Sequence, residues 1–245
     1  MSLQTQLATR LLLPTFRSAW REFVTLSEGT PEDLAQQQAQ KLQALLRDNA
    51  ACSYGQTHHF AELTSFADYQ TAVPVLTGDE LAPWTERIAT GEPQVLTTEP
   101  VTRFEPTSGS TAGQKLIPYT QSLAAEFQAA LYPWLYDLYR AYPALAGGRS
   151  YWSITPVGDR PERTSGGLPI GFDDDLAYFG RLANKLMAPL FVTDDSLARE
   201  TDTERFFFRT ALALLRAGDL RLLSFWNPSF LSRLLDYMRS EARSL

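Results

Sequence analysis

Apolar residues recur every three or four positions along the first part of the chain, which is the spacing of helices that bury one face. Helices are therefore expected at residues 2–27, 31–49, 65–71 and 78–90. Pro14 interrupts the first pattern, so we expect that helix to break or bend there. Thr30 and Thr77 are the predicted N-caps of the second and fourth helices, and Gly91 is the predicted stop of the fourth. The segment from Cys52 to Phe60 has no such pattern and is expected to be a loop.

Short apolar runs alternate with helical patterns from residue 93 onward, which is typical of α/β layering. Strands are expected at 94–96, 101–105, 116–118, 151–155 and 221–226. Helices are expected to start at Thr120 or Gln121, at 173–175, at 201–204 and at 227–228. Pro133 should kink or break the first of these, because proline removes a backbone hydrogen bond. The helix around 206–215 is apolar on nearly all sides and should be buried, with Gly218 as its C-cap.

Composition narrows the classes of protein. An apolar share of 44% is sufficient for a folded core, and a net charge of −6 argues against a general nucleic-acid binder. The single cysteine, Cys52, cannot form an intramolecular disulfide, which is consistent with a cytoplasmic protein. No apolar run approaches the roughly 18 residues of a membrane span, so no membrane partner is expected.

One run of residues, 107–115, has the composition of a ligand-binding loop. It contains hydroxyl side chains, two glycines and a closing lysine, and strand-like segments flank it on both sides. Successive backbone N–H groups in such a turn can bind an anion, and glycine lets a ligand approach closely. It is not a Walker A loop, because only three residues separate Gly109 from Gly113. A serine- and glycine-rich hairpin with a solvated lysine is the alternative.

Two other groups of polar residues favour structural roles. The adjacent His58 and His59 cannot point the same way on a regular element, and they have no partner at metal-ligand spacing. The acidic run at 173–175 is best explained as a helix start, where carboxylates complement the helix dipole. No metal site is therefore predicted from protein side chains.

The run at 107–115 resembles the phosphate-binding loop of the adenylate-forming (ANL) superfamily, whose usual form is Thr-Ser-Gly-Thr-Thr-Gly-x-Pro-Lys-Gly. Thr107, Ser108, Gly109, Thr111 and Lys115 match this form, and Ser110 is a conservative match. Departures at Ala112, Gln114 and Leu116 resemble the branch of auxin-responsive acyl acid amido synthetases and their bacterial relatives. Other segments agree with that branch, namely 54–55, 73–75, 86–88, 91–92 and 226–230.

The resemblance implies an α/β fold in which N-terminal helices precede mixed strand–helix layers, as in the first part of the large N-terminal domain of adenylate-forming enzymes. The chain would be one incomplete adenylating region, with a helical scaffold at 1–92 and an α/β part with the phosphate loop at 93–245. It would lack the adenine and ribose contacts, a later carboxylate and the mobile C-terminal domain of the longer family members.

The implied activity is ATP-dependent activation of a carboxylic acid as an acyl-adenylate, followed by transfer to an amine or amino acid, with ATP and Mg²⁺ as cofactors. Lys115 would be catalytic. The implied nucleotide-binding residues are Thr107, Ser108, Gly109, Ser110, Thr111, Ala112, Gly113 and Lys115. Leu131 and Trp134, on either side of Pro133, are candidates for the wall of the acyl pocket, although their helical spacing also fits core packing.

Two alternatives stay open. A catalytically inactive relative would act as a binding or interaction module. An acyl-CoA ligase is the other alternative, which the departures at Ala112, Gln114 and Leu116 disfavour. An incomplete adenylating region, whether active or inactive, would expose apolar surface through which copies could self-associate.

Overall fold

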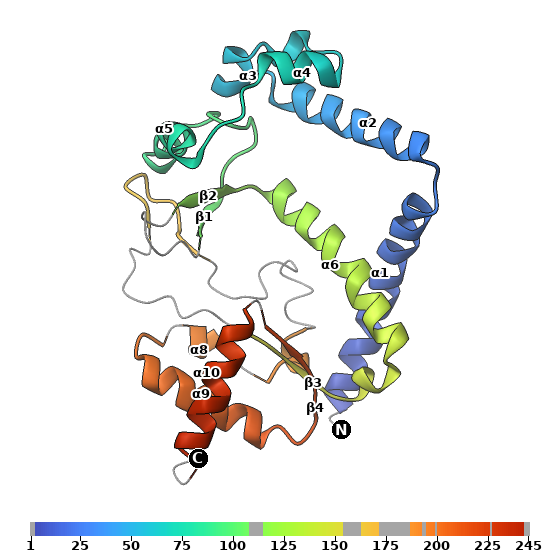
Figure 1. Cartoon of the computed structure of the whole chain (residues 1–245), viewed down its shortest axis with the longest axis vertical. Helices are drawn as coiled ribbons and strands as arrows, with labels where there is room; N and C mark the ends of the chain where they lie inside the picture. The colour runs from blue at the N-terminus through green and yellow to red at the C-terminus, as the bar shows by residue number, and fades with distance from the viewer. Residues whose placement is uncertain are drawn as a thin grey trace. The chain divides into compact units, whose positions relative to one another are not determined.

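A computed structural model describes residues 3–107, 115–153, 163–171, 187–192, 195–198, 200–225 and 227–242 (Figure 1). The chain divides into two compact units. One comprises Glu22–Glu126 with Pro161–Phe172, and the other comprises Met1–Arg21, Phe127–Arg160 and Asp173–Leu245. We call them the hairpin unit and the parallel-sheet unit, after the strands that each contains.

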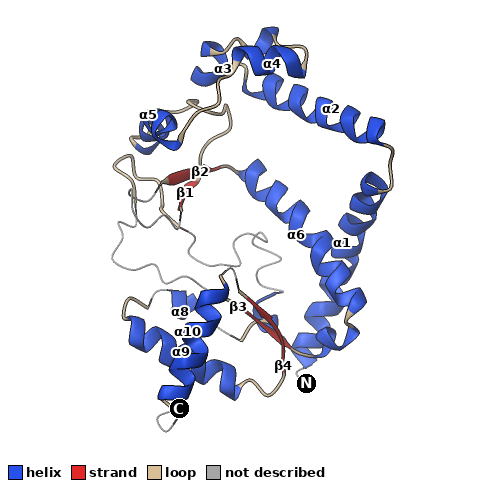
Figure 2. Cartoon of the chain, in the orientation of Figure 1, coloured by secondary structure: helices blue, strands red, loops and turns tan. Residues whose placement is uncertain are grey.

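The hairpin unit is mostly helical, with one small sheet (Figure 2). After the end of α1 (Leu3–Ser27), its elements are α2 (Pro31–Asn49), α3 (Ser53–Thr57), a 3-10 turn η1 (Phe60–Glu62), α4 (Phe66–Ala72), α5 (Gly78–Ala89), β1 (Arg103–Pro106), β2 (Leu116–Tyr119) and the start of α6 (Gln121–Ala141). The strands β1 and β2 pair antiparallel.

The helix starts in this unit follow the predicted local chemistry. Thr30 and Thr77 are N-caps, and in both cases the acidic residue three positions later bonds back to the cap to complete a capping box. Gly91 follows the end of α5 with a φ of 99°, in the left-handed region that favours glycine. These predictions are confirmed.

Two predictions for the hairpin unit are wrong. The segment at 94–96 is not a strand: Gln94 has a φ of 53°, which interrupts extended geometry, and its carbonyl accepts a hydrogen bond from Ser53 N at 2.8 Å. The segment after Cys52 is not simply a loop, because Ser53–Thr57 forms α3. The Cys52 Sγ caps this short helix by accepting a hydrogen bond from Gly55 N at 3.3 Å.

The parallel-sheet unit combines helices with a two-stranded parallel sheet. Its elements are the starting part of α1, the rest of α6, the 3-10 turns η2 (Pro143–Gly147) and η4 (Ala188–Leu190), β3 (Arg149–Trp152), α8 (Asp195–Ala198), α9 (Thr203–Arg216), β4 (Leu220–Ser224) and α10 (Pro228–Ser240). Asn227 caps α10 as predicted.

Neither helix ends at its proline, and the predicted kink at Pro133 stays a prediction. Pro14 lies inside α1 and Pro133 lies inside α6, and both helices continue past their proline. A proline in a helix interior costs about 3 kcal/mol. The residues beside them pack in one apolar cluster of the parallel-sheet unit, formed by Ala8, Leu12, Phe16, Leu135, Met187 and Leu190. Burial of this face offsets the lost backbone hydrogen bond.

The helix α9 starts within the predicted range but differs from its prediction in its C-cap and in burial. Asp202 is the N-cap and Ala217 is the C-cap, so Gly218 lies one residue beyond the predicted position. Only one face is buried: Phe206 and Ala211 are inaccessible to solvent or nearly so, whereas Leu215 is 60% exposed. The predicted helix start at 173–175 lies outside the described residues.

The combination of helices with small sheets confirms the α/β fold class. None of the helices in the described ranges is both long enough and apolar enough to cross a membrane.

Candidate functional site

The two strands that were predicted to flank the candidate loop form a hairpin. Strand β1 pairs antiparallel with β2, from Arg103 opposite Tyr119 to Pro106 opposite Leu116. Beyond the last pair, Thr107 N donates to the Lys115 carbonyl at 2.8 Å, and Lys115 N donates to Thr107 Oγ1 at 3.2 Å. The first and last residues of the predicted loop are therefore held together at its neck.

The predicted nucleotide-binding residues between them, Ser108, Gly109, Ser110, Thr111, Ala112 and Gly113, lie outside the described residues. Thr107 and Lys115 are the two predicted site residues of the loop that the structure describes. Their hydrogen bonds join Thr107 and Lys115 at the end of one strand pair.

The Lys115 side chain extends from the hairpin to the first turn of α5. Its Nζ atom lies 4.0 Å from Asp79 Oδ1, and the two side chains are 54% and 95% exposed. A Cβ atom added at Gly78 would overlap the ammonium group and would lie 2.7 Å from Cε of Lys115. The lysine therefore lies across a glycine at the start of a helix, with its charged end accessible to solvent.

A buried cluster holds the hairpin in place. Phe104, on β1, is fully buried and packs with Ile88 and Val95. A further segment pairs with β1: Phe104 N donates to the Pro169 carbonyl at 2.8 Å, and Gly171 N donates to the Phe104 carbonyl at 2.7 Å. Backbone hydrogen bonds on both sides of Phe104, together with its burial, give the loop neck a rigid base.

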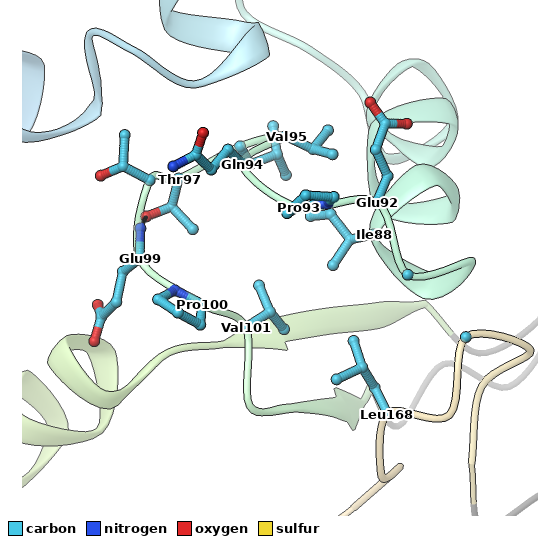
Figure 3. Close-up of a pocket in the computed structure, with 14 residues that line it drawn as sticks. Ile88, Glu92, Pro93, Gln94, Val95, Thr97, Glu99, Pro100, Val101 and Leu168 are labelled. Carbon is cyan, nitrogen blue, oxygen red and sulfur yellow. Dashed lines mark hydrogen bonds between the residues drawn. The ribbon is translucent and has the colours of Figure 1, made fainter.

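A pocket of about 480 Å³ lies in the hairpin unit, between the segment that precedes β1 and the strands themselves (Figure 3). The segment from Gln94 to Pro100 curves around it, and Ile88, Val101 and Leu168 supply apolar wall. Glu92 and Glu99 lie at its edge, but their carboxylates point away from the hollow. The chemistry of its wall is therefore mainly apolar, and of the loop residues that the structure describes, neither Thr107 nor Lys115 lines it.

The two edge carboxylates are held by other elements. Arg87 donates to both oxygens of Glu92, and this pairing holds the pKa of Glu92 below its ordinary value. Burial raises the pKa of Glu99, but hydrogen bonds from Ser122, Thr120 and Gln121 together outweigh it and lower that pKa overall. Glu99 thereby ties this segment to the N-terminus of α6.

The sequence places the two candidate acyl-pocket residues on α6, and the structure gives them different environments. Leu131 packs against the buried cluster of the parallel-sheet unit. Trp134 is 44% exposed, and its ring centroid lies 5.9 Å from that of Trp152. Leu131 thus has the contacts of a core residue, whereas Trp134 offers accessible aromatic surface. Both belong to the parallel-sheet unit, and the Thr107–Lys115 neck belongs to the hairpin unit.

The two histidines have separate partners. His58 Nδ1 lies 2.9 Å from the Ala72 carbonyl, and His59 Nδ1 lies 3.7 Å from Glu62 Oε1. These contacts tie the segment after α3 to the end of α4 and to η1. Contacts of this kind, with a backbone carbonyl and a nearby carboxylate, are those of structural histidines.

Sequence reasoning missed Gly78 and Asp79 as neighbours of Lys115. The residues at 77–80 were interpreted only as a capping box, which they are. A glycine followed by an acidic residue at a helix start was the available signal, but it does not indicate which distant side chain will lie there.

Comparison with known proteins agrees with this fold and hairpin. A family model described as "GH3 family N-terminal domain" matches residues 27–245. The chain is 33% identical over 152 residues to the probable indole-3-acetic acid-amido synthetase GH3.12 of Oryza sativa subsp. japonica, covering 60% of this chain and 24% of that protein. It is 26% identical over 152 residues to the jasmonoyl-L-amino acid synthetase JAR4 of Nicotiana attenuata, covering 61% of this chain and 26% of that protein.

The fold is also found in a solved structure. That structure is "AtGH3.15 acyl acid amido synthetase in complex with 2,4-DB", with a TM-score of 0.75, 19% sequence identity, and coverage of 92% of this chain and 38% of that chain. This chain spans about a quarter of the two curated relatives named above. Because the family model covers most of the sequence, the chain belongs to the GH3 family.

Proposed function

We propose that this chain is the N-terminal, phosphate-binding part of an ATP-dependent acyl acid amido synthetase, with residues 1–245 forming one adenylating region. In this reaction a carboxylate oxygen attacks the α-phosphorus of ATP, and pyrophosphate leaves. An amine, such as that of an amino acid, then attacks the acyl-adenylate, so that an amide forms and AMP is released. The observation that carries the proposal is the family match over 27–245, which includes the hairpin and its loop.

The loop is assigned the part of holding the β- and γ-phosphates. The backbone N–H groups of 107–115, the hydroxyl groups of Ser108, Ser110 and Thr111, and the Lys115 ammonium would stabilise the leaving pyrophosphate. The described residues fit this role, because the hairpin neck is fixed by two hydrogen bonds and the lysine ammonium is accessible beside it. Mg²⁺, when bound, would supply positive charge between phosphate oxygens.

The acid is assigned to an apolar site that includes Trp134 and Leu131. Trp134 supports this assignment best, because it keeps accessible aromatic surface next to Trp152. One named relative is an indole-3-acetic acid-amido synthetase, and the other is a jasmonoyl-L-amino acid synthetase. The proposed substrate pair is therefore an apolar carboxylic acid and an amino-acid acceptor.

ATP–pyrophosphate exchange with a panel of carboxylic acids tests the proposal. We expect acid-dependent exchange by the chain, and a loss of about a hundredfold or more in Lys115→Ala, which is the typical cost of removing one such donor. Lys41→Ala is the matched control, because Lys41 is also an exposed lysine of the hairpin unit and pairs with Glu126. Exchange that is equally reduced in both variants would contradict the role of Lys115.

An inactive binding module is the second candidate, because the described residues Thr107 and Lys115 fit phosphate binding without requiring turnover. Calorimetry with ATP and MgCl₂ separates the two functions. Binding that depends on Lys115 without any exchange would identify a nucleotide-binding module. Exchange would identify an adenylating enzyme.

A further inference from the structure

The first turn of α5 contains two acidic side chains, and they have different bonding. Glu80 Oε2 accepts hydrogen bonds from Thr77 N and Thr77 Oγ1, both at 2.7 Å, so this carboxylate is committed to the capping box. Asp79 takes no part in the cap, and its side chain is 95% exposed. Asp79 is therefore the carboxylate of this turn that can act on whatever Lys115 binds.

Gly78 keeps this carboxylate close to the lysine. Because glycine has no Cβ, the Lys115 side chain can cross the start of α5, and its ammonium lies where a larger residue would place a methyl group. The consequence is the 4.0 Å separation between Lys115 Nζ and Asp79 Oδ1. Any anion that contacts this ammonium must also come close to the Asp79 carboxylate.

We infer that Asp79 is a specificity-determining residue of the phosphate site, which disfavours free polyphosphate and thereby favours its magnesium complex. This inference rests on the proposed function. Like charges at such a distance repel, and the repulsion is only partly screened at physiological ionic strength. Mg²⁺ cancels part of the negative charge of a polyphosphate, so the penalty from Asp79 is smaller for the metal complex.

The inference predicts an asymmetric effect of removing the Asp79 charge. Asp79→Asn keeps the size and polarity of the side chain but removes its repulsion of phosphate. We expect inorganic tripolyphosphate in EDTA to bind about three- to tenfold more tightly to this variant. Binding of tripolyphosphate in excess MgCl₂ should change by a smaller factor, so the preference for the metal complex falls.

Isothermal titration calorimetry at about 0.15 M salt measures these affinities, with Glu86→Gln as the matched control. Glu86 is an exposed carboxylate of the same helix, and it stands seven residues further along, about 10 Å along the axis. At this salt concentration the screening length is about 8 Å, so the effect of Glu86 should be small. Both variants change the net charge equally.

The outcomes separate this inference from the proposed function. If Lys115→Ala binds tripolyphosphate as tightly as the wild type, the proposed function and the role of Asp79 are both overturned. The loop would then not bind phosphate through Lys115. Lys115-dependent binding with Asp79→Asn indistinguishable from Glu86→Gln would overturn the role of Asp79 alone. An equal gain with and without Mg²⁺ would also overturn it, since Asp79 would then act on affinity without selecting the metal complex.

Discussion

Gly78 occupies the first position of α5, where glycine is a poor choice for helix stability. Glycine in a helix interior costs up to about 1 kcal/mol relative to alanine, and less at a terminus. The space that its missing Cβ leaves is filled by the Lys115 side chain. At the residue scale, Gly78 therefore makes α5 less stable than alanine would, at the point where the Lys115 side chain approaches the helix.

A double-mutant cycle tests this explanation of Gly78. Gly78→Ala should raise the free energy of unfolding by about 0.5 kcal/mol in the Lys115→Ala background, because alanine favours the helix. In the wild-type background the gain should be smaller, since the new methyl group must displace the lysine. Urea unfolding of the four proteins measures the difference. Equal gains in both backgrounds would show that Lys115 does not occupy this space.

At the scale of elements, the sequence predicted best what neighbouring residues decide. The caps at Thr30, Thr77 and Asn227 were predictable because a cap involves residues only two or three positions apart. The strand predicted at 94–96 failed because its backbone carbonyls bond to α3, a contact that local sequence does not encode. Pro14 and Pro133 failed as breaks for the same reason, since distant apolar partners decide whether a helix continues.

The capping boxes also predict how stability depends on pH. Backbone and side-chain hydrogen bonds from Thr30 and Thr77 hold the pKa values of Asp33 and Glu80 below their ordinary values of 3.8 and 4.5. Because folding lowers these pKa values, the stabilisation is complete above the ordinary values and is lost as pH falls through the folded ones. We therefore expect the urea midpoint to fall when the pH is lowered from 6 towards about 3.

Glu80→Gln isolates one carboxylate in this titration. Glutamine can keep the hydrogen bonds of a capping box but does not titrate, so the variant should lose stability less steeply with falling pH. The measurement is the urea midpoint at several pH values for both proteins. An identical pH dependence in the two would mean that Glu80 contributes nothing to acid sensitivity.

At the scale of the whole chain, the sequence indicates the composition of the candidate site but not the residues that surround it. The loop at 107–115 was recognisable from its hydroxyl groups, glycines and lysine, and its role in phosphate binding stays a prediction. The position of Asp79 beside Lys115 depends on how α5 packs near β2, which no local pattern specifies. The candidate acyl residue Leu131 was ambiguous for a related reason, because helical spacing fits both a core and a pocket wall.

The division into two units predicts which backbone amides will exchange faster after a mutation in one apolar core. Val95 is 1% exposed and packs with Ile88 and Phe104. All three residues belong to the hairpin unit. Val95→Ala removes two buried methyl groups, which should cost about 1.5–3 kcal/mol. Because this cluster supports the hairpin, amide exchange should accelerate most at Phe104, Thr107 and Gly171.

The amides of the parallel sheet provide the internal control for that experiment. Arg149 N and Ser153 N donate to carbonyls beside or within β4, and they belong to the unit whose apolar clusters do not contain Val95. If the units open separately, Val95→Ala should change the exchange rates of Arg149 and Ser153 much less than those of the hairpin unit. Hydrogen–deuterium exchange at constant pH measures both sets of rates. Equal acceleration in both units would mean that they unfold as one cooperative body, and the loop neck would then owe its rigidity to the whole chain.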